Sequence, residues 1–362
     1  MTGAEPAHFG PKTLAESGWR CSGFTSTVVR MSTMSQYTVA SQAKRRMVEV
    51  AEELAQRHGT MPPPNKRPLQ NLRAVVLLGG TVRPTALRSS IGRSVMDLPV
   101  RNGETLLDRW RSECIQMVEA LGLRALAVRL VVDRASPAIS RGGTSDPRVI
   151  LAVEQDPVEY RGTGGVVADL ARGYDPHDYL LIGNAAQILR SSLSSLATEL
   201  AGDGADVTVI SHTDGTPSGL MLARCSAFGE VSRVGFVDLK EQALPAIARR
   251  HRVQVIEHER PIGLVVRTLG DYIGALRRYH GDLAGVSESL ADLEDWNPQF
   301  SLIEEGTNVH PTARIHDSVV LGGAVVEENA VVVRSVICGG GRVRRGQMAV
   351  DQLVTPPERR RR

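Results

Sequence analysis

The sequence of 362 residues has few cysteines and no long apolar segment. Its cysteines are far apart and form no CxxC pair, so neither a disulfide framework nor a cysteine zinc site is expected. This cysteine usage fits a reducing cytoplasm. The longest apolar runs, such as residues 74–78, are far shorter than the roughly 20 residues that cross a bilayer, so neither a membrane helix nor a membrane partner is expected. The cysteines are Cys21, Cys114, Cys225 and Cys338.

The sequence also lacks an excess of one charge. Its 43 basic and 40 acidic residues give a net charge of +3, and the basic residues are scattered except for Arg359–Arg362. A nucleic-acid partner is therefore not expected. We interpret residues 354–362 as a solvated basic tail. The apolar fraction of 42% and the charged fraction of 23% are typical of a globular protein, here one large domain and a smaller one.

The segment before Leu72 differs in texture from the rest of the chain. Residues 1–35 show no apolar period and no signal-peptide pattern, which predicts a disordered segment or an over-long start. Residues 36–71 carry an amphipathic helical pattern as far as His58 and then consecutive prolines, which predicts a helix followed by a stiff linker.

Residues 72–300 alternate short apolar runs with helical patterns. The run 74–78, which ends at Gly79-Gly80, is too short for a buried helix and predicts a buried parallel strand. The alternation predicts the α/β class with a doubly wound, mostly parallel sheet, whose ligands bind beyond the carboxyl ends of its strands. The predicted strands are 74–78, 126–132, 149–153, 179–182 and 207–210, and the predicted helices are 105–120, 186–200 and 272–279.

Residues 301–353 show a different period. Apolar residues recur every six positions, with small residues beside them, which predicts a short parallel β-helix with one inward residue on each face. About two coils are expected, so the large domain or another subunit must cap them. An irregular antiparallel tail is the alternative. The expected inward residues are Val309, Ile315, Val319, Val325, Val331, Ile337 and Val343.

The first predicted strand leads into a glycine loop with an arginine. Gly79 and Gly80 allow backbone N–H groups to approach a phosphate closely, and Arg83 offers planar, bidentate donors. Such a loop alone is weak evidence for a ligand, because strand-to-helix turns also use glycine for geometry.

Five segments in order resemble the sugar-1-phosphate nucleotidyltransferases, also called NDP-sugar pyrophosphorylases. The resemblance implies a nucleotidyltransferase, Rossmann-like domain and a C-terminal hexapeptide-repeat, left-handed β-helix. It also implies transfer of a nucleotidyl group from a nucleoside triphosphate to a sugar-1-phosphate, with release of pyrophosphate, in nucleotide-sugar biosynthesis. The segments are 74–110, 159–170, 178–184, 263–272 and 309–313, within roughly Leu72 to Val343.

The resemblance assigns roles to particular residues. The glycine loop holds the triphosphate, the Gly-Thr-Gly segment faces the base or sugar, and Arg93 stands in for a signature lysine. The expected catalytic residues are Arg83 and Arg93. The expected nucleotide-binding residues are Leu78, Gly79, Gly80, Thr81, Gly162, Thr163 and Gly164.

Several positions depart from the family pattern. Family members generally hold Mg²⁺ with two aspartates, but the first position reads Asn184 and the second falls at Val265. Asn184 and Asp97 are the weak metal ligands that remain, so Mg²⁺ is an uncertain cofactor. Lysine is also scarce, and Lys240, at a predicted helix start, reads more simply as a solvated charge.

Three functions follow as alternatives. The first is a divergent nucleotidyltransferase with degenerate metal ligands. The second is a catalytically weak or inactive relative that binds nucleotide or nucleotide sugar as a regulatory or scaffold subunit. The third, and least favoured, is an acyltransferase that uses His310 or His316 as a general base. In each case the β-helix is expected to mediate homo- or hetero-oligomer formation.

Overall fold

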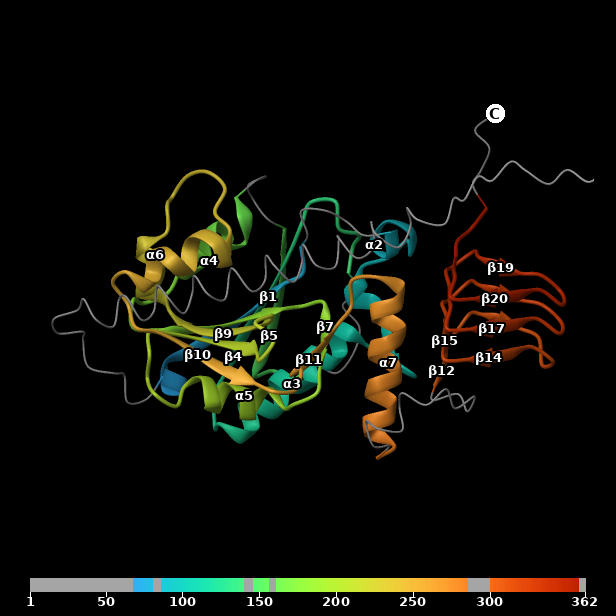
Figure 1. Cartoon of the computed structure of the whole chain (residues 1–362), viewed down its shortest axis with the longest axis horizontal. Helices are drawn as coiled ribbons and strands as arrows, with labels where there is room; N and C mark the ends of the chain where they lie inside the picture. The colour runs from blue at the N-terminus through green and yellow to red at the C-terminus, as the bar shows by residue number, and fades with distance from the viewer. Residues whose placement is uncertain (1–67, 81–85, 140–145, 156–160, 286–299, 358–362) are drawn as a thin grey trace, which may run out of the picture.

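The computed structural model describes residues 68–80, 86–139, 146–155, 161–285 and 300–357. It contains an α/β part followed by a stack of short parallel strands, with helix α7 (Leu269–Leu283) lying between them (Figure 1). Within the described residues, no helix is both long and apolar enough to cross a membrane.

The α/β part is built on a seven-stranded, mostly parallel sheet. Its strand order is β10-β8-β9-β6-β1-β4-β5, and β1 lies parallel to both of its neighbours, β4 and β6. Only β9 runs antiparallel to the strands beside it. The predicted α/β class is confirmed. The strands are β1 (Leu72–Leu78), β4 (Leu126–Val132), β5 (Val149–Gln155), β6 (Tyr179–Asn184), β8 (Val207–His212), β9 (Pro217–Arg224) and β10 (Val253–His258).

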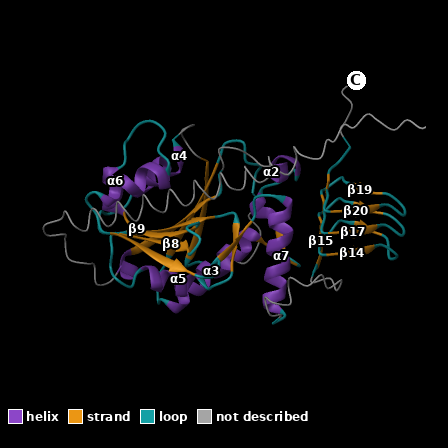
Figure 2. Ribbon diagram, in the orientation of Figure 1, coloured by secondary structure: helices purple, strands orange, loops and turns teal. Residues whose placement is uncertain are grey.

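Helices cover both faces of this sheet (Figure 2). On one face, α3 (Leu106–Ala120) and α5 (Leu193–Leu200) pack over the larger core cluster, to which α7 and the short α2 (Ala86–Ser90) also contribute. On the other, α4 (Gly162–Ala171) and α6 (Leu244–Ala248) pack over the second cluster.

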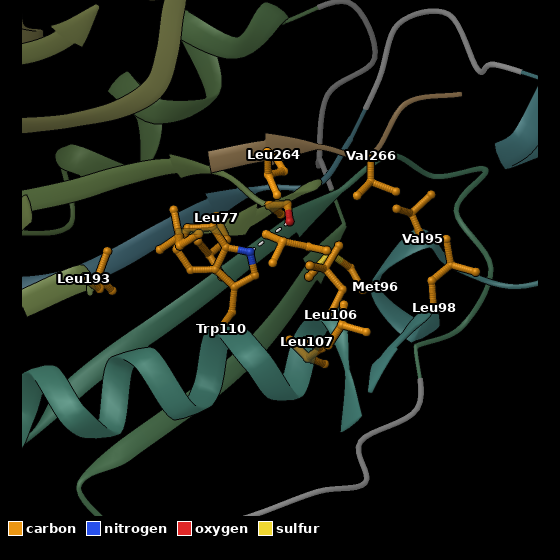
Figure 3. Close-up of a cluster of buried hydrophobic side chains, with 14 of the residues drawn as sticks. Leu77, Val95, Met96, Leu98, Leu106, Leu107, Trp110, Leu193, Leu264 and Val266 are labelled. Carbon is orange, nitrogen blue, oxygen red and sulfur yellow. Dashed lines mark hydrogen bonds between the residues drawn. The ribbon is translucent and has the colours of Figure 1, made fainter. Parts of the chain in front are cut away.

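Helix α3 shows how the sequence makes these elements. Thr105 and Asp108 form a capping box at its start, and apolar residues at helical spacing turn one side of α3 toward the sheet. Trp110 lies at the centre of that side beside Leu77 and Leu264, and its indole N–H donates to the Ala185 carbonyl at 2.9 Å (Figure 3).

The prediction of a helix over residues 186–200 is wrong for its first part. Residues 187–189 form strand β7 (Gln187–Leu189), which pairs antiparallel with β11 (Gly263–Val265), and α5 begins only after its cap, Ser192. The pairing partner comes much later in the chain, after β10, so local periodicity could not indicate it.

Residues 301–354 form three parallel sheets that wind as a β-helix-like coil. The sheets are β12-β15-β18-β21, β13-β16-β19 and β14-β17-β20. The strands are β12 (Ser301–Ile303), β13 (Asn308–Val309), β14 (Arg314–His316), β15 (Ser318–Val320), β16 (Val325–Val326), β17 (Val331–Val333), β18 (Val336–Ile337), β19 (Arg342–Val343), β20 (Met348–Val350) and β21 (Leu353–Val354).

The spacing within the coil departs from strict steps of six. Val309, Val326 and Val343 stack in successive coils, so three coils are present where about two were expected. One face is a residue shorter because its corner is tight: Asp317, Arg334 and Asp351 have φ of 44°, 46° and 53°. Inside that corner, the hydroxyl of buried Ser318 accepts from the N–H of Ser335, the residue one coil further on.

The short face shifts the predicted register of inward residues by one in the middle of the coil. There Val320, Val326 and Val332 lie in the coil interior, instead of the expected Val319, Val325 and Val331. The prediction holds for the other four residues, Val309, Ile315, Ile337 and Val343, which belong to or pack against the same interior cluster. Val319 packs instead into the core cluster of the α/β part, which accounts for its apolar side chain. The α/β part, which was expected to cap this region, therefore covers the coil along β15.

Candidate functional site

The carboxyl end of β1 was expected to form a phosphate-binding loop. Its Leu78 carbonyl accepts the N–H of Ala185 at 3.1 Å, and the N–H of Gly79 donates to Val131 at 2.8 Å. The Gly79 carbonyl accepts Arg88 Nη2 at 2.7 Å. Backbone groups up to Gly79 are thus used within the protein, and Gly80 is the first exposed residue beyond the strand. Thr81 and Arg83 lie outside the described residues.

Packing against β4 accounts for the two glycines. A Cβ on Gly79 would lie 3.1 Å from Leu130 Cδ1, and a Cβ on Gly80 would lie 3.1 Å from the Asp133 amide nitrogen. A close approach of β4 therefore requires small residues here with or without a ligand.

The Gly-Thr-Gly segment forms the first turn of α4. Gly162 has φ of 72°, and a Cβ there would lie 2.4 Å from the Val237 carbonyl oxygen. That carbonyl accepts the N–H groups of Gly164 and Gly165 at 2.9 and 3.2 Å. The Val237 carbonyl thus occupies donors that a helix start otherwise offers to an anion. Thr163 stays exposed on this turn.

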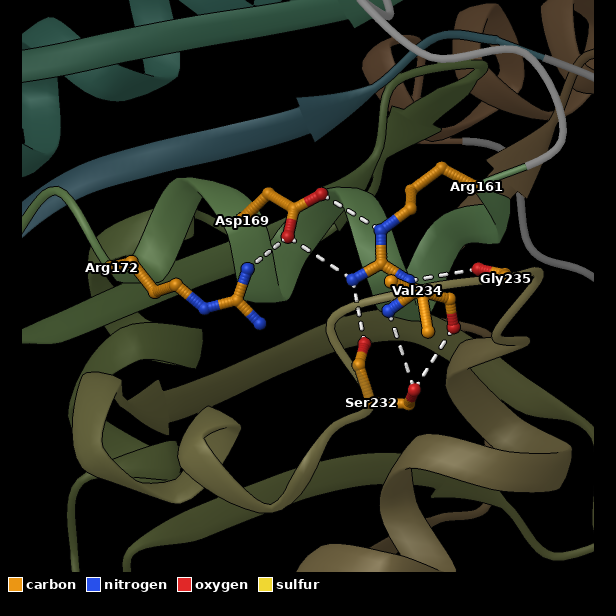
Figure 4. A network of polar contacts seen from close by, with 6 residues as sticks. All are labelled: Arg161, Asp169, Arg172, Ser232, Val234 and Gly235. Atoms are coloured by element: carbon orange, nitrogen blue, oxygen red, sulfur yellow. Dashed lines mark hydrogen bonds and ion pairs between the residues drawn. The ribbon is translucent and has the colours of Figure 1, made fainter.

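Arg161 holds this arrangement in place (Figure 4). Its side chain, in a residue that is 4% exposed, donates to the carbonyls of Ser232 and Gly235 at 2.7 and 2.8 Å and pairs with Asp169 at 2.8 Å. Hydrogen bonds from Arg161 lower the pKa of Asp169, which also pairs with Arg172. The sequence analysis did not single out Arg161, although it directly precedes the Gly-Thr-Gly segment.

Lys240 lies on the segment that packs against this turn. It belongs to η4 (Leu239–Ala243), which is capped by Asp238, and the N–H of Leu239 donates to Thr163 Oγ1 at 3.3 Å. Partial burial lowers the pKa of Lys240 and repulsion from Arg267 adds to the effect, whereas Asp238 and Glu241 oppose it. The residue as a whole is exposed to solvent. No ion pair with Lys240 occurs among the described residues.

The end of β6 presents neutral groups. Asn184 Oδ1 accepts the N–H of Ala186 at 3.1 Å, and the Ala186 carbonyl accepts the N–H of Val266 at 2.9 Å. These bonds place Asn184 close to Val265, the two positions that the family resemblance pairs as metal ligands. Beside them Gln187, which is 1% exposed, has no hydrogen-bond partner for either side-chain amide atom.

The two remaining residues that were predicted for the site are Asp97 and Arg93. Asp97 is buried in the 3-10 helix η2 (Val95–Asp97). Arg93 Nη1 lies 2.7 Å from Glu304 Oε1, in the turn after β12, and so links this loop to the coil.

The donor set does not suit a magnesium ion held by two carboxylates. In the described part of the chain, no group of three or more His, Cys, Asp or Glu side chains is arranged to hold a metal ion. Asn184 offers one amide oxygen that already accepts a hydrogen bond, and Val265 offers no ligand atom.

A cavity of about 660 Å³ lies at the junction with the coil. Arg101, His280 and Phe300 line it, and none of the described residues predicted to bind nucleotide does so. His310, the candidate acyltransfer base, instead forms a local turn, with Nδ1 2.9 Å from Thr312 Oγ1.

Comparisons with known proteins assign no family. No family model and no curated protein matches the sequence. Among solved structures, the crystal structure of HddC from Yersinia pseudotuberculosis is similar with a TM-score of 0.41 and 12% identity, over 57% of this chain and all of that one.

Proposed function

We propose that this chain is a nucleotidyltransferase-like protein that binds a nucleotide or nucleotide sugar through its phosphates, with little or no magnesium-dependent transfer. The ligand lies beyond the carboxyl ends of β1 and β6, between Gly80, Thr163 and Lys240. The architecture supports this position. The sheet is mostly parallel with β1 inside it, and ligands of such sheets bind beyond their carboxyl ends.

The observation that carries the proposal is the position of Lys240 on η4, the segment that packs on the first turn of α4, where the N–H of Leu239 donates to Thr163 Oγ1. Burial lowers the pKa of Lys240, and repulsion from Arg267 lowers it further. An anionic group beside Lys240 would relieve this repulsion and raise the pKa again. A phosphate has the charge and the acceptor oxygens to do so.

Loss of the metal ligands supports binding over transfer. Transfer of a nucleotidyl group requires neutralisation of the charge that develops as pyrophosphate departs. With Asn184 and Val265 at the two ligand positions, any Mg²⁺ held through Asn184 would be held weakly.

A divergent transferase is the second candidate. The exposed Gly80 and Thr163 favour it, because they leave room for a nucleotide at both turns. In that reaction the phosphate of a sugar-1-phosphate attacks the α-phosphorus of a nucleoside triphosphate and expels pyrophosphate. Gly80, Thr81 and Arg83 would then cradle the triphosphate beyond Gly79, whose N–H already donates to Val131, with Arg93 as a further cation.

Two measurements on the full chain test these proposals. Calorimetric titration with each nucleoside triphosphate and with nucleotide sugars should show binding that weakens in Lys240→Ala. Pyrophosphate release with a panel of sugar-1-phosphates should stay at background. Turnover that Arg83→Ala abolishes would establish the transferase, and absence of binding to every nucleotide and nucleotide sugar would refute both candidates.

Self-association through the coil remains a separate proposal. The sheet β14-β17-β20 presents Met348, which is 64% exposed, and Val350 on its outer face. Met348→Glu should lower the mass of any oligomer that uses this face, as measured by light scattering. An unchanged mass would exclude this surface.

A further inference from the structure

Strand β5 ends the seven-stranded sheet, and its outer edge has no partner among the described strands. The run from Val149 to Val153 is entirely apolar, and every residue of the strand is at least partly exposed. Ile150 is 61% exposed. A long apolar edge without proline, lysine or a bulge is a template for a further strand.

The opposite edge of the same sheet differs. Strand β10 carries Gln254, Glu257 and His258, and Gln254 and His258 form hydrogen bonds with Asp203 and Glu199. Polar and charged side chains are the common protection of an edge strand. Strand β5 lacks this protection, which indicates that another strand pairs with its edge.

The hydrogen bonds to β4 show which backbone groups of β5 point outward. The N–H of Leu126 donates to the carbonyl of Arg148 at 2.7 Å, and Leu126 pairs in parallel with Val149. Because bonding direction alternates along a parallel ladder, the even-numbered residues bond β4. The N–H and C=O groups of Leu151 and Val153 therefore face outward, as does the Val149 carbonyl. The N–H of Val149 is already used by the carbonyl of Asp146 at 3.0 Å.

These outward groups fit a second copy of the same strand. In an antiparallel pair centred on Leu151, the N–H and C=O of Leu151 meet those of Leu151 in the second copy. The N–H of Val153 meets the Val149 carbonyl of the second copy. The arrangement makes four hydrogen bonds about a two-fold axis, and the Val149 N–H keeps its bond to the Asp146 carbonyl.

Side chains fit the same register. Ile150 lies opposite Ala152 of the second copy, a large apolar residue beside a small one. Arg148 lies opposite Glu154 of the second copy, so opposite charges meet at both ends of the paired segment. Within each chain Arg129 already holds Glu154, and Asp146 holds Arg148, which keeps both charged groups at the strand. A register centred on Ala152 would place Ile150 against Glu154 instead.

We infer that β5 pairs antiparallel with β5 of a second copy, centred on Leu151, so that two chains share one continuous sheet. The even-numbered side chains 148 to 154 line one face of the junction, and Val149, Leu151 and Val153 line the other.

Cysteine cross-linking tests the register directly. In this pairing the Cα atoms of the hydrogen-bonded Leu151 pair lie about 5.5 Å apart and those of the Ile150–Ala152 pair about 4.5 Å apart, both within the range that a disulfide spans. Leu151→Cys, in a chain with Cys21→Ser, should give an oxidised dimer. Ile150→Cys should not, because the two copies of residue 150 lie on a diagonal of about 7–8 Å. The double variant Ile150→Cys with Ala152→Cys should cross-link again. Cys114, Cys225 and Cys338 are buried, and burial raises the pKa of the first two to about 12, so they do not compete.

Sedimentation measures the association itself. Ile150→Lys should raise the dissociation constant of the dimer about tenfold, since two substituted pairs are introduced. The matched variant Val255→Lys, at a residue 39% exposed on β10, should leave the constant unchanged. Leu151→Pro removes only an outward N–H and should give a folded monomer. The proposal is overturned if wild type is monomeric at high concentration, or if Ile150→Cys cross-links as readily as Leu151→Cys.

Discussion

The two walls of the strand-end region differ in charge. The β6–β11 wall, formed by Asn184, Gln187 and Val265, carries no charge and leaves a buried amide without a partner. The α4–η4 wall, formed by the first turn of α4 and residues 237–243, is closely packed and carries Lys240 beside Asp238 and Glu241. Magnesium chemistry would depend on the first wall and phosphate binding on the second. This difference supports the proposal of nucleotide binding with little or no transfer.

The largest effect is expected where the α4–η4 wall is tightest. Gly162→Ala places a methyl group 2.4 Å from the Val237 carbonyl at a φ of 72°. Strain and overpacking together should lower the free energy of unfolding by about 2–4 kcal/mol. Urea denaturation measures the change. Gly92→Ala is the matched control, with φ of 71° and no atom within 4 Å, and should cost only about 1–2 kcal/mol. Equal costs would show that Val237 does not press on Gly162.

Removing the ammonium group of Lys240 should weaken ligand binding next most strongly. Lys240→Ala should lower nucleotide affinity about 10- to 100-fold, the loss of one charge-assisted contact to phosphate. Lys240→Arg keeps the charge and should stay within about threefold. Because the pKa of Lys240 is lowered, the ammonium loses its proton at a lower pH than an ordinary lysine. Affinity in wild type should then fall as pH rises toward 10, and affinity in Lys240→Arg should not. Unchanged affinity in Lys240→Ala would show that the phosphates do not bind at this wall.

Much of the fold could be predicted from the sequence because its core strands are continuous apolar runs. The predicted strand at 74–78 is β1, and the helix at 105–120 is α3. Strands β9 and β10 were not predicted, because β10 mixes apolar with polar residues and β9 contains Gly219 at φ of 77°. Their places depend on pairing with distant strands, which local pattern does not encode.

Only those parts of the candidate site that lie within a single segment of the chain could be predicted from the sequence. The glycines at 79–80 and 162–164 mark close approaches of backbone, but the sequence does not distinguish a phosphate from a neighbouring strand as the approaching group. Lys240 reads as an ordinary surface charge in sequence. Its setting comes from η4 packing on helix α4, which lies much earlier in the chain, and from Arg267 on a third segment.

The salt bridge behind the α4–η4 wall gives a smaller, pH-dependent effect. Asp169→Asn should lower the free energy of unfolding by about 1–2 kcal/mol at pH 7, because Arg161 then keeps its charge in a buried position without its anion. The pKa of Asp169 is lowered in the folded chain, so its stabilisation is present above the unfolded pKa of about 3.9 and is lost as pH falls through the lower folded pKa. Urea denaturation at pH 7 and pH 3 should show the two chains converging in acid. Asp351→Asn, which breaks the exposed pair with Arg334 in the coil, should change stability by no more than about 0.5 kcal/mol. Equal changes in the free energy of unfolding for the two variants would show that the pair of Arg161 with Asp169 stabilises the chain no more than the exposed pair does.

Introducing carboxylates into the β6–β11 wall should have the smallest effect. In wild type, Mg²⁺ should change nucleotide affinity by less than about threefold, because the wall offers only the neutral amide oxygens of Asn184 and Gln187. The double variant Asn184→Asp with Val265→Asp provides two carboxylates at neighbouring positions, and Mg²⁺ should then raise nucleotide affinity about tenfold. Asn184→Ser with Val265→Ser changes the same positions without charge and should respond like wild type. Calorimetric titration with and without the ion measures each case. A strong magnesium requirement for nucleotide binding in wild type would mean that ligands outside this wall hold the ion. Magnesium binding would then not depend on the β6–β11 wall.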